Sequence, residues 1–78
     1  MTLKQLRKIL RSFGVSEDPA RGKGSHTLFS MEIDGRVFSY PVPTSRRDVL
    51  PCYIKGCREK FRLDAENGVS DKEFYGRG

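Results

Sequence analysis

The feature that most constrains the fold is a hairpin centred on Asp34-Gly35. Asp-Gly is a favoured pair for a two-residue type I′ turn, and such a turn sets the register of the flanking strands. The predicted cross-strand pairs are Ile33 with Arg36, Met31 with Phe38, Phe29 with Tyr40, and Thr27 with Val42. Because alternate residues of a strand point to opposite faces, one face of this hairpin is apolar and needs a cover of helices. His26 falls on the other face.

A helix is predicted before the hairpin, over about residues 2–13. Thr2 is a suitable N-cap with Gln5 in the capping-box position, and Gly14 is a suitable C-terminal stop. Between this helix and the hairpin we expect a short extended piece and then a loop. Pro19 allows at most an edge strand there.

A second helix is predicted after the hairpin, which Pro41 and Pro43 are expected to end. It begins near Pro51 and closes at Asn67-Gly68. Its apolar face is formed by residues at three- and four-residue steps: Leu50, Ile54, Cys57, Phe61 and Ala65. Ser70 with Glu73 then forms a capping box for a final helical turn that carries Phe74, and both Phe74 and Tyr75 are expected to pack.

Residues 1–78 are therefore expected to form a single α+β domain. The order of elements predicts an α-β-β-β-α arrangement with a three-stranded antiparallel sheet and both helices on one face. Double-stranded-RNA-binding domains share this architecture. Leu, Ile, Val and Phe supply 19 of the 78 residues, enough to expect a folded chain. No apolar run approaches the roughly 18 residues that span a bilayer, so we expect a cytoplasmic protein that does not contact membranes.

The charge is high and unevenly distributed. The net charge is +5, and residues 1–62 carry 13 Lys and Arg against 6 Asp and Glu. The remaining residues carry 2 against 4. A basic body with a mildly acidic tail favours a polyanionic partner, with nucleic acid first.

Cys52 and Cys57 are the two cysteines, and His26 is the only histidine. A spacing of five suits neither a local disulfide nor a zinc site. We expect two reduced, buried thiols, no metal and no small-molecule cofactor.

Several short motifs, in order along nearly the whole chain, resemble the HicA (YcfA-like) family of bacterial toxins. Gly24-Ser25-His26 stands at the start of the first hairpin strand and is followed by Phe29. A basic first helix ends in Phe13-Gly14, and Pro41-Val42-Pro43 ends the second hairpin strand. The tail Gly68-Val69-Ser70-Asp71-Lys72-Glu73-Phe74 is similar to the family's closing motif.

The resemblance implies an endoribonuclease that cleaves mRNA, the toxin of a type II toxin–antitoxin system restrained by a cognate HicB-type antitoxin protein. It also implies a fold like that of double-stranded-RNA-binding domains. The family's catalytic histidine maps onto His26. The chain departs from the family at Thr27 and Thr44, where a histidine is common, and at Pro51-Cys52-Tyr53, where Gly-Thr-Leu is usual.

Cleavage of RNA without a metal needs a base, an acid and cations beside the phosphate. An imidazole can serve as base or acid near neutral pH, so His26 is the candidate catalytic residue. The candidate RNA-binding residues are Arg21, Lys23, Gly24, Ser25, Arg46 and Arg47. Arg46 and Arg47 can contact the phosphate only if the loop after the hairpin folds back beside His26. The second proton-transfer group stays open between Lys23, Tyr40 and a water.

Two alternatives remain at this point. The chain could be an RNA-binding module of the same fold without catalysis, since the charge is the same and the family's further histidines are missing. It could also be an interaction protein whose basic face binds an acidic protein.

Overall fold

The hairpin at Asp34-Gly35 forms the larger part of a three-stranded antiparallel sheet. The computed structural model describes residues 1–20 and 24–78. The strands are β1 (Ser16–Asp18), β2 (His26–Ile33) and β3 (Arg36–Pro43), in the order β1-β2-β3. All four predicted cross-strand pairs are confirmed. Asp34 and Gly35 have φ angles of 52° and 78°, as a type I′ turn requires.

β3 ends at Pro43, as the sequence predicts, and Pro41 lies two residues inside it. β3 is an edge strand, where proline is tolerated. The Thr44 amide donates to the Ser25 carbonyl at 2.7 Å. Hydrogen-bonded pairs alternate with unbonded pairs along an antiparallel ladder. Pro41 and Pro43 therefore occupy unbonded pairs, at which the backbone nitrogen faces the free edge.

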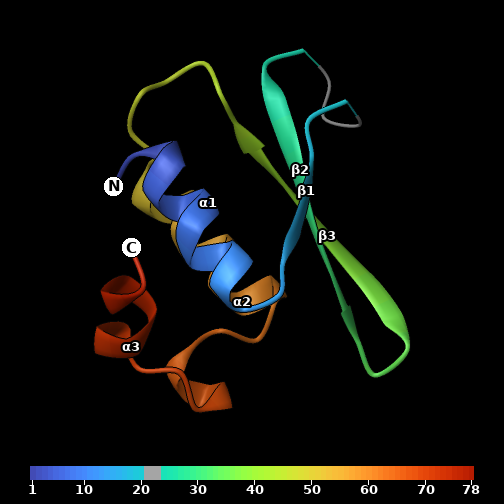
Figure 1. Ribbon diagram of the computed structural model, residues 1–78, viewed down its shortest axis with the longest axis vertical. Coiled ribbons are helices and arrows are strands. Elements are labelled where there is room, and N and C mark those ends of the chain that lie inside the picture. Colours follow the sequence, from blue (N-terminus) through green and yellow to red (C-terminus); the bar gives the residue numbers. More distant parts are fainter. Residues whose placement is uncertain (21–23) are drawn as a thin grey trace.

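Two helices lie on the same side of the sheet, α1 (Leu3–Ser12) and α2 (Pro51–Lys60), as Figure 1 shows. The predicted capping box of α1 is confirmed: the Thr2 hydroxyl accepts from the Gln5 amide, and the Gln5 side chain accepts from the Thr2 amide. Gly14 follows the helix with a φ of 89°, which suits a C-terminal stop. A 3₁₀ turn, η1 (Ala65–Asn67), and a short helix, α3 (Asp71–Gly76), complete the chain beside the helix pair.

The predicted end of the second helix at Asn67-Gly68 was wrong, because α2 ends at Lys60. Arg62 takes a left-handed conformation with a φ of 55°. The Leu63 amide donates to the Arg58 carbonyl at 2.7 Å, and the Arg62 amide donates to the Glu59 carbonyl at 3.3 Å. These are the two hydrogen bonds of a Schellman motif, which usually has glycine at the left-handed position. With arginine at that position, the sequence pattern does not reveal the stop.

Both ends of the predicted apolar face of α2 differ in the structure. Ala65 lies in η1 and is exposed, and Leu50 is the N-cap of α2 with 39% of its surface exposed. Val49 is buried in place of Leu50.

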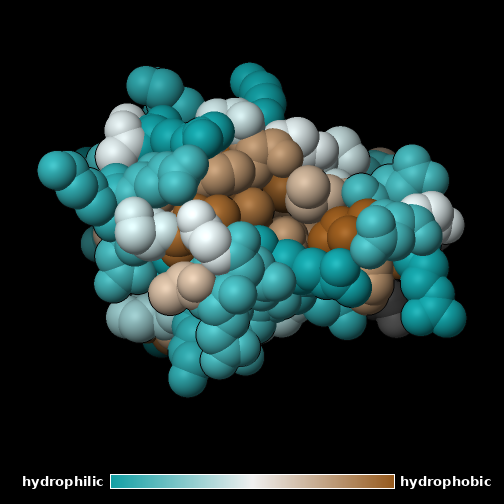
Figure 2. All heavy atoms as spheres, turned by 90° about the horizontal axis from the view of Figure 1, so that it is seen from below, coloured by the Kyte–Doolittle hydropathy of each residue, from teal (hydrophilic) through white to brown (hydrophobic). Residues whose placement is uncertain are grey.

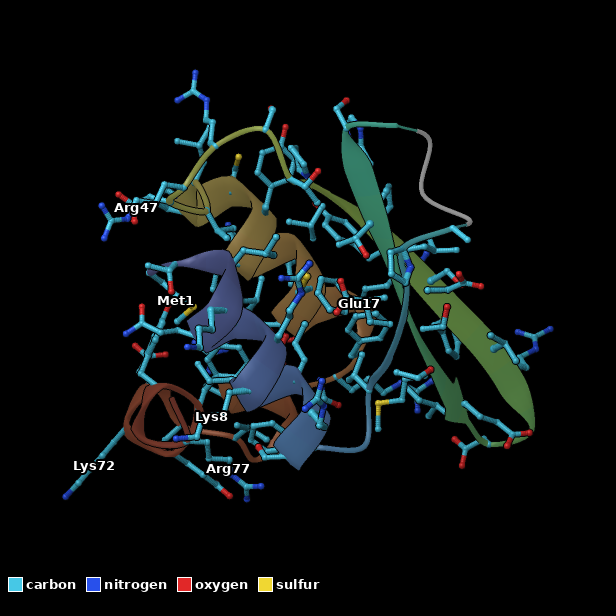
Figure 3. All side chains as sticks on the ribbon, turned by 45° about the horizontal axis from the view of Figure 1, so that its top comes forward. Met1, Lys8, Glu17, Arg47, Lys72 and Arg77 are labelled. Carbon is cyan, nitrogen blue, oxygen red and sulfur yellow. The ribbon has the colours of Figure 1, made fainter. Side chains whose placement is uncertain are left out.

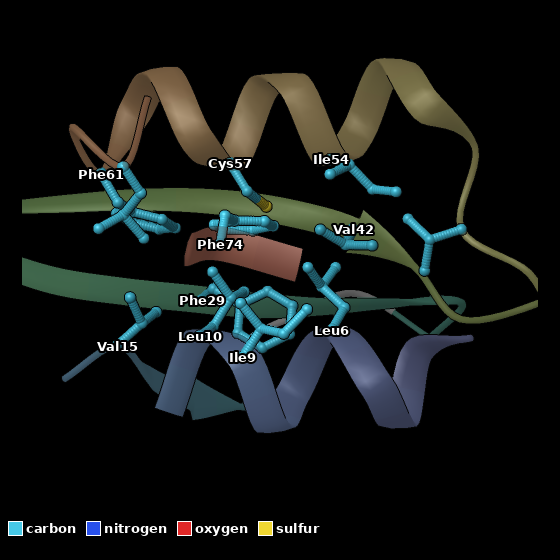
Figure 4. Packing of buried hydrophobic residues seen from close by; sticks show 12 residues of the cluster. Leu6, Ile9, Leu10, Val15, Phe29, Val42, Ile54, Cys57, Phe61 and Phe74 are labelled. Atoms are coloured by element: carbon cyan, nitrogen blue, oxygen red, sulfur yellow. The ribbon is translucent and has the colours of Figure 1, made fainter. Parts of the chain in front are cut away.

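The core lies between the helix pair and the inner face of the sheet, as Figure 4 shows. Its fully buried members come from every layer, and they include Leu6, Ile9, Leu10, Phe29, Val42, Cys57, Phe61 and Phe74. Burial of Phe74 agrees with the prediction, whereas Tyr75 is 47% exposed. Met31, Ile33 and Phe38, at the far end of the hairpin, are only half-buried, so the helices cover part of the apolar face. Apolar side chains accordingly remain visible in Figure 2.

A half-buried network of hydrogen bonds connects the start of β2 to the first helix. The Thr27 hydroxyl donates to Glu17 Oε2 at 2.6 Å, and Arg7 Nε donates to both oxygens of the same carboxylate at 2.9 and 3.0 Å. Thr27 is 1% exposed. Because each polar group of this network has a partner, the network stabilises one position of β2 against α1 and β1. No helix of the described residues is long and apolar enough to cross a membrane.

Candidate functional site

His26 begins β2 and lies exposed on the sheet face opposite the core. It is paired with Pro43 at the end of β3. The Ser25 hydroxyl lies 3.3 Å from His26 Nδ1. Nε2 has no hydrogen bond within the described part of the chain, so this nitrogen is available to a ligand.

The loop from residue 44 to residue 50 folds back beside His26. At one end, the hydrogen bond from Thr44 to the Ser25 carbonyl extends the hairpin ladder by one pair. At the other end, the Val49 amide donates to the Met1 carbonyl at 2.9 Å, and Asp48 forms an isolated β-bridge with Thr2. The loop is thus attached both to the sheet and to the segment before α1.

This loop, the strand ends and the first turn of α2 enclose a pocket of about 310 Å³. We call it the His26 pocket. Its lining consists of His26, Pro43, Ser45, Arg46, Asp48, Val49, Leu50 and Tyr53. The lining combines polar and charged side chains with apolar ones, a mixture that can hold and orient a small ligand. The volume is that of a site for one small group, such as a single nucleotide, rather than for a folded partner.

The structure separates the two arginines of the loop. Arg46 lines the His26 pocket. Arg47 does not, and Figure 3 shows it on the side of the loop that faces away from the sheet, near Met1. Arg46 is therefore the arginine that can reach a phosphate held at His26.

Gly24 and Ser25 are the described residues of the glycine-rich loop before His26. Gly24 and Ser25 are exposed directly before β2, and Gly24 has a φ of 50°. Arg21 and Lys23, both predicted to bind RNA, lie outside the described residues. Lys23 was also one of the predicted candidates for the second proton-transfer group.

Tyr40, the other side chain suggested for that role, lies on the core side of the sheet. Its ring and hydroxyl occupy the space that a side chain at Gly56 would need. Burial raises the pKa of Tyr40, and Cys57 and other nearby groups add to the rise. Tyr40 is therefore a packing residue that does not line the His26 pocket.

Six residues that line the pocket were not singled out as functional from the sequence: Pro43, Ser45, Asp48, Val49, Leu50 and Tyr53. Leu50 was assigned to the core, and Tyr53 was noted only as a departure from a family motif. No local pattern places them beside His26, because the loop reaches it through contacts between segments far apart in sequence. Their proximity in sequence to Arg46 is the one signal that could have included them.

The cysteines are not part of this pocket. Cys57 is buried, and burial raises the pKa of its thiol to about 12. Cys52 is exposed, contrary to the prediction of two buried thiols, because it lies on the outer side of α2 near its start. Among the described residues, no group of three or more His, Cys, Asp and Glu side chains could hold a metal ion.

A larger hollow, of about 680 Å³, lies between α2 and α3. Four carboxylates line it: Glu59, Asp64, Glu66 and Asp71. Asp71 pairs with Arg58, which also lines this hollow. An excess of carboxylates repels phosphate, so the His26 pocket is the better candidate for a polyanion.

Exposed cations also follow the outer side of α1. Lys4, Lys8 and Arg11 are exposed, and the first turn of the helix holds no acidic residue. Like charges three and four residues apart on a helix repel each other. This row adds to the positive field of the molecule, outside the His26 pocket.

Comparisons with protein-family models, with curated proteins and with solved structures found no match for this chain.

Proposed function

We propose that the protein is an endoribonuclease that cleaves mRNA without a metal, with His26 as its catalytic residue. The observation that carries this proposal is the His26 pocket itself, where the only histidine of the chain and Arg46 line one small cavity. The family resemblance at Gly24-Ser25-His26 supports the same assignment. The biological role that follows is that of a HicA-like toxin of a type II toxin–antitoxin system, acting in the cytoplasm without a small-molecule cofactor.

The proposed reaction uses the ribose 2′-hydroxyl as the nucleophile. His26 Nε2 takes the proton of this hydroxyl while its oxygen attacks the neighbouring phosphorus. The bond from phosphorus to the 5′-oxygen breaks, and that oxygen takes up a proton as it leaves. The products are a 2′,3′-cyclic phosphate and a 5′-hydroxyl. Arg46 stabilises the added negative charge on the phosphorane, because a guanidinium can donate to two oxygens at once.

The fold and the charge support the choice of RNA as the substrate. We propose that the α-β-β-β-α arrangement is that of a double-stranded-RNA-binding domain, adapted here to present a pocket at one end of the sheet. The net charge of +5 attracts a polyanion to the molecule. A HicB-type antitoxin would then inhibit the toxin by covering the His26 pocket.

A second candidate is an RNA-binding module of the same fold without catalysis. The row of exposed cations on α1 favours it, since these residues can bind phosphates outside the pocket. This module would bind RNA with an affinity that falls steeply with salt, and it would leave the RNA intact.

Induced expression in bacteria tests the toxin proposal through growth. The wild-type chain is expected to arrest growth, and His26→Ala is expected to abolish the arrest. Arg46→Ala should weaken it, whereas Arg47→Ala, the matched control, should not, because Arg47 lies outside the pocket. Each variant is checked for soluble, folded protein. Arrest by a folded His26→Ala protein would refute the assignment of His26.

A further inference from the structure

We propose that Tyr53 is the general acid that donates the proton to the leaving 5′-oxygen. This inference rests on the proposed function and completes it, since His26 accounts for only one of the two proton transfers. Tyr53 lines the same pocket as His26 and Arg46. The three side chains come from three different elements: β2, the loop after β3, and α2.

The position of Tyr53 is set by the fold. It lies in the first turn of α2, where its amide donates to the Leu50 carbonyl at 3.0 Å. Its side chain is half-buried and packs against the hydrophobic core. A side chain held in this way loses little further freedom when substrate binds, which favours catalysis by positioning.

The hydroxyl of Tyr53 is free for this task. It makes no hydrogen bond to any residue that the structure describes. A phenol O–H is a proton donor, and it carries no negative charge that would repel a phosphate. A tyrosine is therefore compatible with a site for RNA.

The other proton-bearing side chains of the pocket fit the role less well. Asp48 is exposed, and an ionised carboxylate only accepts hydrogen bonds. Ser45 offers an aliphatic hydroxyl, a much weaker acid than a phenol. Arg46 does not release its proton in proteins.

The complete step then balances between two side chains. His26 gains the proton of the 2′-hydroxyl as the new bond from oxygen to phosphorus forms. Tyr53 loses its proton to the 5′-oxygen as the old bond breaks. A proton passing from His26 to Tyr53 through solvent returns both groups to their starting forms.

The decisive experiment replaces the leaving oxygen with sulfur. Two versions of one oligoribonucleotide are made around a mapped cleavage position, one normal and one with a bridging 5′-sulfur. A thiolate leaves without taking a proton, so the sulfur substrate does not need the general acid. Purified wild type, Tyr53→Phe, His26→Ala and the control Tyr75→Phe are assayed on both. Tyr75 is exposed on α3 and does not line the His26 pocket.

We expect Tyr53→Phe to cleave the normal substrate about 10²–10⁴-fold more slowly than wild type, the usual range for loss of acid–base catalysis. On the sulfur substrate it should match wild type, while His26→Ala stays slow on both. An equal loss on both substrates would show that Tyr53 only maintains the structure of the site, and no loss on either would remove it from the reaction. If wild type cleaves neither substrate, the proposed function itself fails.

Discussion

At the scale of single residues, two positions in α2 show what burial does. Gly56, in the middle of α2, weakens a helix when considered alone. In the folded molecule it leaves the space that the Tyr40 ring occupies. The sequence shows that Gly56 is a weak helix former. It does not show that the Tyr40 ring packs against this position, because the two residues come from different elements. Cys57 is the second such residue, and its burial has a measurable consequence.

Stability should fall at high pH because of Cys57. Burial raises the pKa of its thiol to about 12, whereas a thiol in an unfolded chain ionises near pH 8.5, roughly. The stabilising contribution is therefore fully present below the unfolded pKa. Above it the folded protein binds more protons than the unfolded chain, so the free energy of unfolding decreases by up to about 1.4 kcal/mol per pH unit.

Urea unfolding between neutral pH and pH 11 measures this effect. Wild type should lose stability more steeply above pH 9 than Cys57→Ala, which starts less stable because the core loses a buried side chain. The pKa of Tyr40 is also raised, chiefly by burial, and this part of the rise is common to both proteins. The part caused by Cys57 is lost in Cys57→Ala, so it adds to the expected difference in the same direction. Parallel pH profiles for the two proteins would contradict a buried, neutral thiol.

At the scale of elements, the hairpin could be predicted in full and the second helix only in part. The turn pair Asp34-Gly35 and the alternation of apolar residues are local signals, and together they determine the register. The end of α2 depends on Arg62 in a left-handed conformation. Arginine gives no local sign of this conformation. It is stabilised by burial of Leu63 in the core and by the two hydrogen bonds that the Arg62 and Leu63 amides donate to carbonyls of α2.

Arg58 holds the end of α2 to the segment that leads into α3. Its Nε donates to the Leu63 carbonyl at 2.8 Å, and one terminal nitrogen donates to the Val69 carbonyl at 3.0 Å. The other pairs with Asp71 at 2.5 Å, and the guanidinium lies 4.7 Å from the centre of the Phe74 ring. Arg58 is 9% exposed. One side chain thus donates hydrogen bonds to two backbone carbonyls that lie outside the helices.

Arg58→Ala is expected to destabilise the protein by about 1–3 kcal/mol, the usual cost of leaving buried polar groups without partners. Lys60→Ala, an exposed position on the same helix, is the matched control and should change stability by less than about 0.5 kcal/mol. Urea unfolding measures the difference, and amide exchange in α3 should rise only in Arg58→Ala. Equal stability of the two variants would show that the contacts of Arg58 do not support the fold.

At the scale of the whole molecule, the α+β class and the three-stranded sheet followed from the sequence, but the site followed only in part. His26 and Arg46 were both predicted, the latter on the condition that its loop folds back. That condition depends on contacts from the loop to Ser25 and Met1. Hydrogen bonds between segments so far apart leave no periodic pattern in a sequence, so the separation of Arg46 from Arg47 and the presence of Tyr53 could not be predicted.

The most direct test of the account is cleavage of a long mRNA in the presence of EDTA by purified wild type and His26→Ala, matched for folding by circular dichroism. The account predicts 2′,3′-cyclic phosphate ends from wild type and intact RNA from His26→Ala. Intact RNA with both proteins, while both still bind it, would contradict catalysis and favour the binding module. Equal cleavage by both would remove His26 from the chemistry.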